Sequence, residues 1–184
     1  MSRSLETQKL INEKTVQRYI FEELNYGNKD TLKKFYPNSV LQILGSKQIK
    51  VIIPNYPLEF TKVENGINKI KEHKTDFRII YDDYTYHNVE VEWVTSSFES
   101  HGKEVYEQIY KDGKGFLMVL EDDSISNDKI DYIDTNDIKQ IDAEKFAYWY
   151  VLKSKYIVDE TISNYVPHYL SRTSKPWLIY LAVY

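Results

Sequence analysis

The sequence contains no cysteine among its 184 residues, which excludes a disulfide framework and any thiolate metal site. It has only 6 Gly and 5 Pro, and no Pro/Gly-rich linker divides it. No apolar run is as long as a membrane span, and the N-terminus has no apolar core of signal-peptide length. These absences predict a soluble, cytoplasmic protein without a membrane partner, folded as one domain over residues 1–184.

The composition is that of a globular protein, with 42% hydrophobic and 28% charged residues, and it is rich in tyrosine. Charge is uneven along the chain. Lys and Arg minus Asp and Glu gives 14 − 9 = +5 for residues 1–81, 5 − 17 = −12 for 82–144 and 5 − 2 = +3 for 145–184. Basic segments that shared a face would bind a polyanion. The alternative is that acids simply collect in solvated loops after Glu121.

The first half of the chain shows helical and strand patterns in turn. We expect a helix carrying Val16, Tyr19, Ile20 and Leu24 and ending near 25–27, then a short helix from Asp30 to Pro37. Runs 40–44 and 49–53 indicate a β-hairpin. After Pro54 and Pro57, the i, i+4, i+7 spacing of Val63, Ile67 and Ile70 predicts an amphipathic helix.

The second half suggests a hairpin followed by a crossover. The expected order is strand 77–81, turn 82–83, antiparallel strand 86–95, helix 100–110 closed by Gly113 and Gly115, and strand 116–120. From Asp142 the pattern is helical and aromatic, interrupted by Pro167, with an apolar tail at 177–184. The fold class predicted is α/β, in three layers, with a central mixed β-sheet flanked by helices.

Three acids stand where two of these strands would meet. Asp76 opens the strand at 77–81, and Glu90 and Glu92 alternate with Val91 on its partner, so both glutamates share one face. Converging carboxylates suit a hard divalent cation such as Mg²⁺, whose bound water can act as a nucleophile. The plainer interpretation is a solvated strand face that alternates Val with Glu. No other catalytic motif is present, and the four histidines show no metal-ligand spacing.

These residues resemble the motif of the PD-(D/E)XK nuclease superfamily, which has a restriction-endonuclease-like fold. In that family an Asp begins one strand, D/E-x-K lies on the adjacent antiparallel strand, and a helix and a further strand follow. Here Lys74-Thr75-Asp76 stands for Pro-Asp and Glu90-Val91-Glu92 for the triplet. The likeness covers about residues 59–121. Glu92 replaces the usual lysine, similar to restriction enzymes of the BamHI type.

The resemblance implies a Mg²⁺-dependent endodeoxyribonuclease, with Mn²⁺ as a substitute ion, most simply a type II restriction endonuclease. Asp76, Glu90 and the backbone carbonyl of Val91 would hold the metal. Glu92 would act as general base, as metal ligand, or as neither. The nuclease core would span about 40–123, with a helical, aromatic part at about 142–184. The expected partner is double-stranded DNA, bound by a homodimer because the duplex is itself two-fold.

Further residues are weaker candidates for the same chemistry. The accessory candidates are Glu64, Lys74, His101 and Lys103, and the candidates for DNA phosphate contacts are Lys62, Lys69, Lys71 and Arg78. Glu64 is expected on the helix preceding Asp76, where it is either a metal ligand or the partner of a nearby lysine. His101 is either a proton donor near a phosphate or a surface residue beside a Ser100 cap. Glu121, Asp122 and Asp123 form either a separate cation site or an acidic loop.

Two alternatives to a restriction enzyme remain open at this stage. The first is a nuclease of a phage or mobile element, which would use the same residues. The second is a non-catalytic α/β DNA-binding or protein-interaction module, in which the acids only solvate the surface.

Overall fold

A computed structural model describes residues 13–27, 38–111, 114–124, 132–146 and 149–150. The chain divides into two compact units, residues 1–42 with 142–184, and residues 43–141. Most of the segment predicted as the nuclease core, about residues 40–123, therefore belongs to the second unit. No helix among the described residues is long and apolar enough to cross a membrane. The predicted helix at 30–37 and the C-terminal segment from 151 onwards lie outside the described residues.

Helix α2 (Glu13–Tyr26) in the first unit confirms the N-terminal helix predicted from periodicity. Its buried residues recur at helical spacing and form one stripe. They are Val16, Tyr19, Ile20, Glu23 and Leu24. The one acid in this stripe, Glu23, is paired with Lys145, whose side chain is only 10% exposed. Lys145 lies in a short helical segment that begins at residue 143, as expected from Asp142 onwards.

The hairpin predicted at 40–44 and 49–53 is wrong, because residues 40–43 form the short helix α4 (Val40–Ile43). Ser39 explains the difference: its hydroxyl accepts a hydrogen bond from the backbone N–H of Gln42 at 3.2 Å. That is the bond of a helix N-cap, which satisfies one of the donors at a helix start. A local cap thus overrides the strand preference of the β-branched and apolar residues around it.

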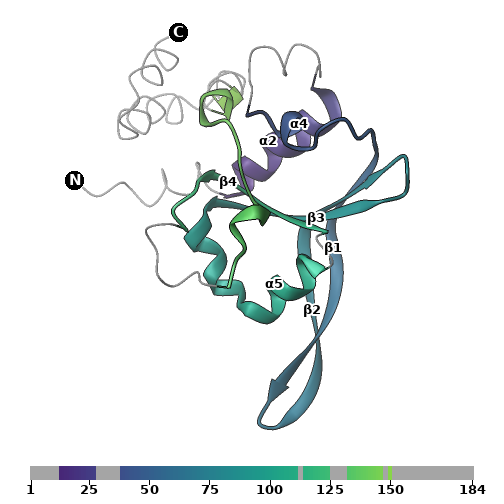
Figure 1. Ribbon diagram of the computed structural model, residues 1–184, viewed down its shortest axis with the longest axis vertical. Helices are drawn as coiled ribbons and strands as arrows, with labels where there is room; N and C mark the ends of the chain where they lie inside the picture. Colours follow the sequence, from purple (N-terminus) through teal and green to yellow (C-terminus); the bar gives the residue numbers. More distant parts are fainter. Residues whose placement is uncertain (1–12, 28–37, 112–113, 125–131, 147–148, 151–184) are drawn as a thin grey trace, which may run out of the picture. The chain divides into compact units, whose positions relative to one another are not determined.

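The second unit is built on one five-stranded mixed sheet, so the predicted α/β class with a mixed sheet is confirmed (Figure 1). The strand order is β1-β2-β3-β4-β5. The bounds are β1 Ile49–Glu64, β2 Ile67–Tyr81, β3 Tyr86–Val94, β4 Gly115–Glu121 and β5 Ile138–Gln140. The first three strands are antiparallel, and β4 and β5 run parallel to β3. Strand β5 was not predicted, because three residues carry too little pattern.

The amphipathic helix predicted around Val63, Ile67 and Ile70 is wrong, because this segment is the end of the β1–β2 hairpin. Asn65 and Gly66 form its two-residue loop with φ of 53° and 76°. Positive φ at both positions is the geometry that Asn-Gly favours in hairpins. The hairpin projects beyond the other strands as a twisted ribbon (Figure 1). We call residues 59–72, which lie outside the paired β2–β3 segment, the arm.

The crossover from β3 to β4 confirms the predicted order of strand, helix and parallel strand. Between the strands lie the 3₁₀ helix η1 (Thr95–His101) and helix α5 (Lys103–Ile109). Gly115 begins β4 against the end of α5, where a Cβ would come within 2.4 Å of the Tyr110 ring. Glycine therefore permits the close approach of helix and strand that the crossover needs.

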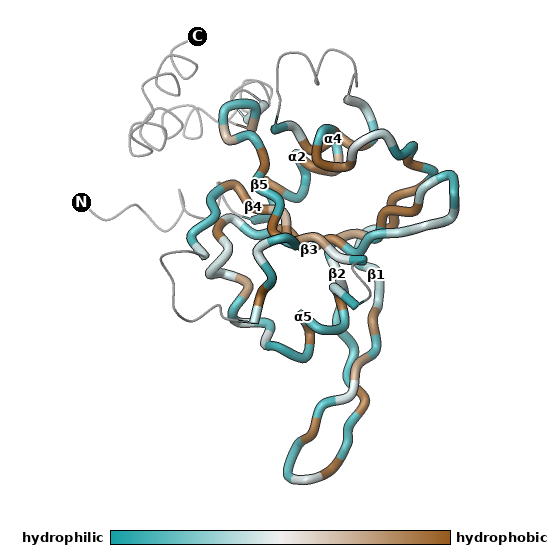
Figure 2. The backbone as a smooth tube through the Cα atoms, in the orientation of Figure 1, coloured by the Kyte–Doolittle hydropathy of each residue, from teal (hydrophilic) through white to brown (hydrophobic). Residues whose placement is uncertain are grey.

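One hydrophobic cluster of the second unit lies on the α5 side of the sheet. Its buried members are Leu58, Phe98, Val105, Ile109, Tyr110, Leu117, Val119, Ile133 and Ile138. They come from β1, η1, α5 and its end, β4, β5 and the segment before β5, so this one cluster joins the crossover to the sheet. The residues of the arm, in contrast, alternate between hydrophilic and hydrophobic along the ribbon (Figure 2). A short 3₁₀ turn, η4 (Thr135–Asp137), precedes β5.

Candidate functional site

Asp76 lies within β2 and not at the start of a strand, because β2 begins at Ile67. The regular pairing of β2 with β3 nevertheless ends at Phe77 opposite Val89. Next to that point, Oδ2 of Asp76 accepts a hydrogen bond from the backbone N–H of Val91 at 2.8 Å. The carboxylate therefore replaces the backbone acceptor where β2 leaves β3. This hydrogen bond occupies Oδ2 of Asp76, a residue that the sequence predicts to bind metal.

Glu90 and Glu92 both lie on the α5 side of β3. In the parallel register they stand beside Leu117 and Val119, which belong to the core on that side. Their exposed fractions are 3% and 4%, so neither is a solvated surface residue. Burial of an ionised carboxylate is costly unless it is paired. The plain interpretation of this strand as a solvated Val/Glu alternation is therefore wrong.

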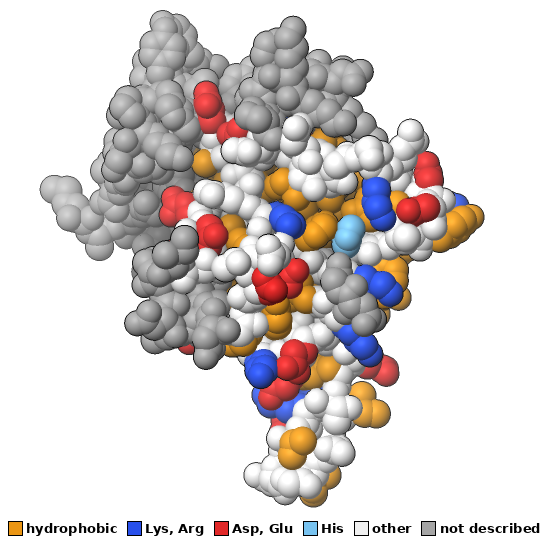
Figure 3. Space-filling model, in the orientation of Figure 1, with side chains coloured by type: hydrophobic (Ala, Val, Ile, Leu, Met, Phe, Trp, Pro, Cys, Tyr) orange, Lys and Arg blue, Asp and Glu red, His pale blue; other side chains and the backbone are white. Residues whose placement is uncertain are grey.

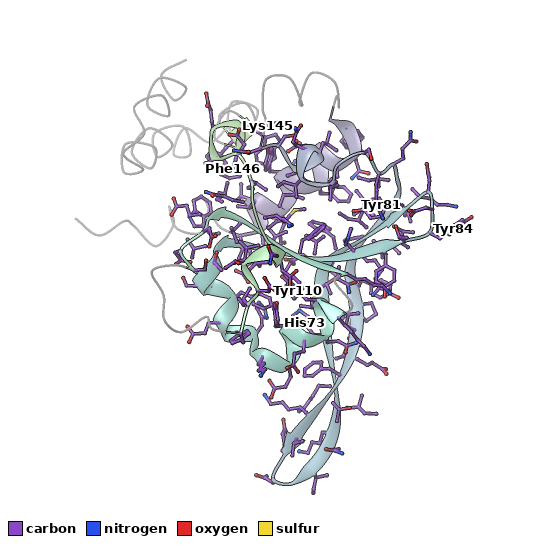
Figure 4. The ribbon with its side chains drawn as sticks, viewed as in Figure 1. His73, Tyr81, Tyr84, Tyr110, Lys145 and Phe146 are labelled. Atoms are coloured by element: carbon purple, nitrogen blue, oxygen red, sulfur yellow. The ribbon has the colours of Figure 1, made fainter. Side chains whose placement is uncertain are left out.

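A histidine contacts each of these glutamates. Nε2 of His73 lies 3.1 Å from Oε1 of Glu90, and Nε2 of His101 lies 3.1 Å from Oε1 of Glu92. The centroids of the two imidazole rings are 5.2 Å apart. We call these four residues the Glu–His cluster. Figure 4 labels His73, from β2, and Tyr110, from the end of α5.

Charge and burial in the cluster shift the pKa of nearby groups. Burial raises the pKa of Glu90 above its usual value, the hydrogen bond from His73 opposes this, and the negative charge of Glu92 adds to it. The pKa of Tyr110 is raised well above 10 by burial and then by the charge of Glu90. Among the described residues the Tyr110 hydroxyl has no hydrogen-bond partner. The cluster thus places two buried carboxylates and two partly exposed imidazoles beside the apolar residues of the sheet and α5.

Arg78 is held in the protein instead of projecting freely towards a ligand. Its guanidinium stacks 3.6 Å from the centroid of the Tyr56 ring and 4.2 Å from that of Tyr86. Its Nε donates to Oδ1 of Asn88 at 2.9 Å. The amide of Asn88 in turn donates to the backbone carbonyl of Ile109 at the end of α5. Arg78 therefore braces the strand that carries the glutamates.

The accessory candidates are spread over different elements. Glu64 lies on the arm and not on a helix, which corrects its predicted position. It forms ion pairs with Lys69 at 2.9 Å and Lys71 at 3.1 Å, and hydrogen bonds from these lysines lower its pKa. Lys103, at the start of α5, lies 3.8 Å from Glu107. Lys74 is adjacent to His73 in the strand, so its side chain is on the other face, 3.9 Å from Glu72.

Asp122 and Asp123 hold the start of η1. Oδ1 of Asp122 accepts from the Thr95 hydroxyl at 2.9 Å, and Asp123 accepts from both the backbone N–H and the hydroxyl of Ser96. Burial raises the pKa of Asp122, but hydrogen bonds from Ser124 and Thr95 outweigh it, and the net shift is downward. These contacts give the two acids a structural role that needs no cation. Glu121, at the end of β4, is exposed.

The donors of the Glu–His cluster are carboxylate oxygens and imidazole nitrogens, which are ligand types for divalent cations. In the part of the chain that the structure describes, however, no three His, Asp or Glu side chains are arranged to hold one ion. The glutamates face histidines instead. The donor types therefore suit a divalent cation, whereas the side chains are arranged as two Glu–His pairs.

The Glu–His cluster shows what sequence reasoning missed. His73 and Asp76 are separated by an odd number of positions, so strand alternation predicts opposite faces for them. His101 was expected to be a proton donor or a surface residue. Only the packing of β2 and η1 against β3 brings the two histidines to the glutamates.

Compared with known proteins, the chain matches no family, no curated protein and no solved structure.

Proposed function

We propose that the protein is a Mg²⁺-dependent endodeoxyribonuclease of the restriction-endonuclease-like fold, acting on double-stranded DNA as a homodimer. A type II restriction enzyme is the role we favour. The observation that carries the proposal is the order of elements around the acids. Asp76 lies on β2, Glu90 and Glu92 on the adjacent antiparallel β3, and α5 and the parallel β4 follow. This order is similar to that of the PD-(D/E)XK motif, although Asp76 lies within its strand and not at its start.

The burial of Glu90 supports an ionic ligand at this position. A buried carboxylate is costly without a partner, and a divalent cation beside it would favour its ionised form. Asp76 and Glu90 are the residues that would hold Mg²⁺ or Mn²⁺. When bound, the ion would act as a Lewis acid on the phosphate and lower the pKa of its water.

Glu92 and His101 would take part in transferring the proton of the attacking water. Glu92 would accept it from the attacking water as the water oxygen bonds to phosphorus and the P–O bond to the leaving oxygen breaks. His101, at 3.1 Å from Glu92, would orient the carboxylate and share the proton. In this scheme His101 is a positioning residue, because it acts through Glu92.

Plasmid cleavage tests the proposal directly. Supercoiled DNA would be incubated with the full chain in Mg²⁺, in Mn²⁺ and in EDTA, beside Asp76→Asn, Glu90→Gln and Glu92→Gln. The matched control is Glu72→Gln, an acid of the arm whose side chain is 53% exposed. We expect metal-dependent linear or nicked products from the wild type and from the control, and a loss of at least 100-fold in the other variants. Equal products from all proteins, or none from the wild type, would contradict the proposal.

A second candidate is a DNA-binding module without catalysis, and one observation favours it. His73 and His101 already serve as partners of the two buried glutamates, so the cluster is satisfied without an ion. In that case the wild type would bind duplex DNA equally well in Mg²⁺ and EDTA and would yield no product with either metal.

A further inference from the structure

The two faces of the arm carry opposite charge. Residues directly opposite in an antiparallel pair share a face, and the faces alternate along each strand. Lys62 stands opposite Lys69, Phe60 opposite Lys71, and Leu58 opposite His73. Lys62, Lys69 and Lys71 therefore lie on the same side of the ribbon, which we call the lysine face.

Within residues 59–72 the lysine face has three lysines and one acid, Glu64, so its charge is 3 − 1 = +2. The opposite face has Glu59 opposite Glu72 and no basic residue, so its charge is −2. Figure 3 shows basic and acidic side chains together on the arm, with hydrophobic ones near its end. The separation of charge between faces gives the ribbon one side that suits a polyanion.

The lysine face also leads to the Glu–His cluster. Its rows of side chains run from Lys62 and Lys69, past Lys71, to His73 at the base of the arm. His73 is the residue that contacts Glu90. A chain of phosphates lying along this face would therefore be directed towards the acids of the proposed active site.

Two further features of the arm suit duplex DNA. The arm reaches about 20 Å, from six residues at a rise of about 3.4 Å each, and the major groove of DNA admits a two-stranded β-ribbon. Ile67, at the end of the lysine face, is 62% exposed and available for apolar contact with a sugar or a thymine methyl. Glu64 forms ion pairs with Lys69 and Lys71 on this face, and Lys62 stands directly opposite Lys69. Phosphates would add to the partial neutralisation that Glu64 provides.

We propose that the lysine face of the arm binds the phosphate backbone of double-stranded DNA and guides the duplex to the Glu–His cluster. The proposal rests on the proposed function for its substrate. It assigns phosphate contacts to Lys62, Lys69 and Lys71 on a β-ribbon. It assigns no phosphate contact to Arg78, whose guanidinium stacks on the rings of Tyr56 and Tyr86 and stabilises the sheet.

DNA binding in EDTA tests the proposal apart from cleavage. Anisotropy of a labelled duplex of about 25 base pairs, enough to cover the roughly 20 Å of the arm, would be titrated with full-length wild type and with the triple variant Lys62→Gln, Lys69→Gln and Lys71→Gln. The matched single-charge pair is Lys62→Gln and Lys74→Gln, since Lys74 is exposed on the opposite face. We expect the triple variant to raise Kd at least tenfold and to flatten the log Kd against log salt slope by about 3. Lys62→Gln should flatten it by about 1, and Lys74→Gln should leave it unchanged.

The possible outcomes separate this proposal from the nuclease. Equal effects of Lys62→Gln and Lys74→Gln, or an unchanged triple variant, would overturn the role of the lysine face even if the wild type cuts DNA. Binding that depends on the lysine face without any cleavage in Mg²⁺ would support the arm and reject the nuclease. If the triple variant alters the sedimentation coefficient of the protein but not its DNA affinity, the arm joins copies of the chain and the proposal fails.

Discussion

The carboxylate of Asp76 accepts a hydrogen bond from the backbone N–H of Val91 at the place where β2 and β3 cease to pair. Asp76 therefore has a structural role that does not depend on any role in catalysis. Val91 is fully buried, so a loss of this acceptor would leave a backbone donor unsatisfied in the interior.

Substitution at Asp76 should separate the two tasks. Asp76→Ala removes the acceptor, and we expect the free energy of unfolding to fall by about 1–3 kcal/mol. Asp76→Asn keeps an oxygen at the same place and should cost less than about 1 kcal/mol. Urea unfolding of the two variants measures the difference. Equal losses would show that the Val91 bond does not need this side chain, whereas DNA cleavage should be abolished in both if the nuclease proposal holds.

His87 makes stability depend on pH. Its pKa is lowered from 6.5 to about 4, mainly by burial and then by the charges of Lys47 and Lys139, and its Nδ1 lies 2.7 Å from the Tyr81 hydroxyl. Because the unfolded chain binds the proton more readily, the free energy of unfolding should fall as the pH drops from 6.5 towards 4. His87→Gln should flatten that decline in denaturation curves recorded between these pH values. If the variant and the wild type decline in parallel, His87 is not the group that titrates.

The buried pair of Glu23 and Lys145 predicts a strong coupling in the first unit. Burial lowers the pKa of Lys145, and the Glu23 carboxylate opposes that shift. Lys145→Met leaves a buried charge without its partner and should cost about 3–5 kcal/mol of unfolding free energy. The double variant Glu23→Leu, Lys145→Met should recover most of it, since an apolar pair replaces the ion pair. Additive losses in this double-mutant cycle would contradict the coupling.

Substitution of Gly66 should destabilise the arm and leave the rest of the sheet unchanged. Its φ is 76°, and no atom lies within 4 Å of a Cβ placed there, so the cost of Gly66→Ala is one of backbone conformation. We expect the arm to lose about 1 kcal/mol of stability, which corresponds to roughly fivefold faster hydrogen exchange of its amides. Amides of β3 and β4 should keep their exchange rates, and Asn68→Ala, in the exposed strand next to the turn, is the matched control. Uniform acceleration throughout the sheet would mean that the arm and the sheet unfold together.

Local pattern was sufficient where each residue's own preference agreed with its surroundings. The helix around Tyr19 and Ile20 and the strand–helix–strand order after Tyr86 were predicted because burial stripes and strand runs were strong. The segment around Ile67 was misread, because three apolar residues fit a helical spacing by chance. The Asn65-Gly66 pair was the local signal that could have corrected it.

The sequence by itself determined that Glu90 and Glu92 share one face of a strand, because side chains alternate in any β-strand. It also placed Asp76 near them, since hairpin strands are adjacent. Only the tertiary structure decided that this face is buried, that Asp76 binds the Val91 N–H, and that His73 and His101 meet the glutamates. Those contacts depend on how β2 leaves β3 and how η1 packs over the sheet, and such distant packing has no signature in residue spacing.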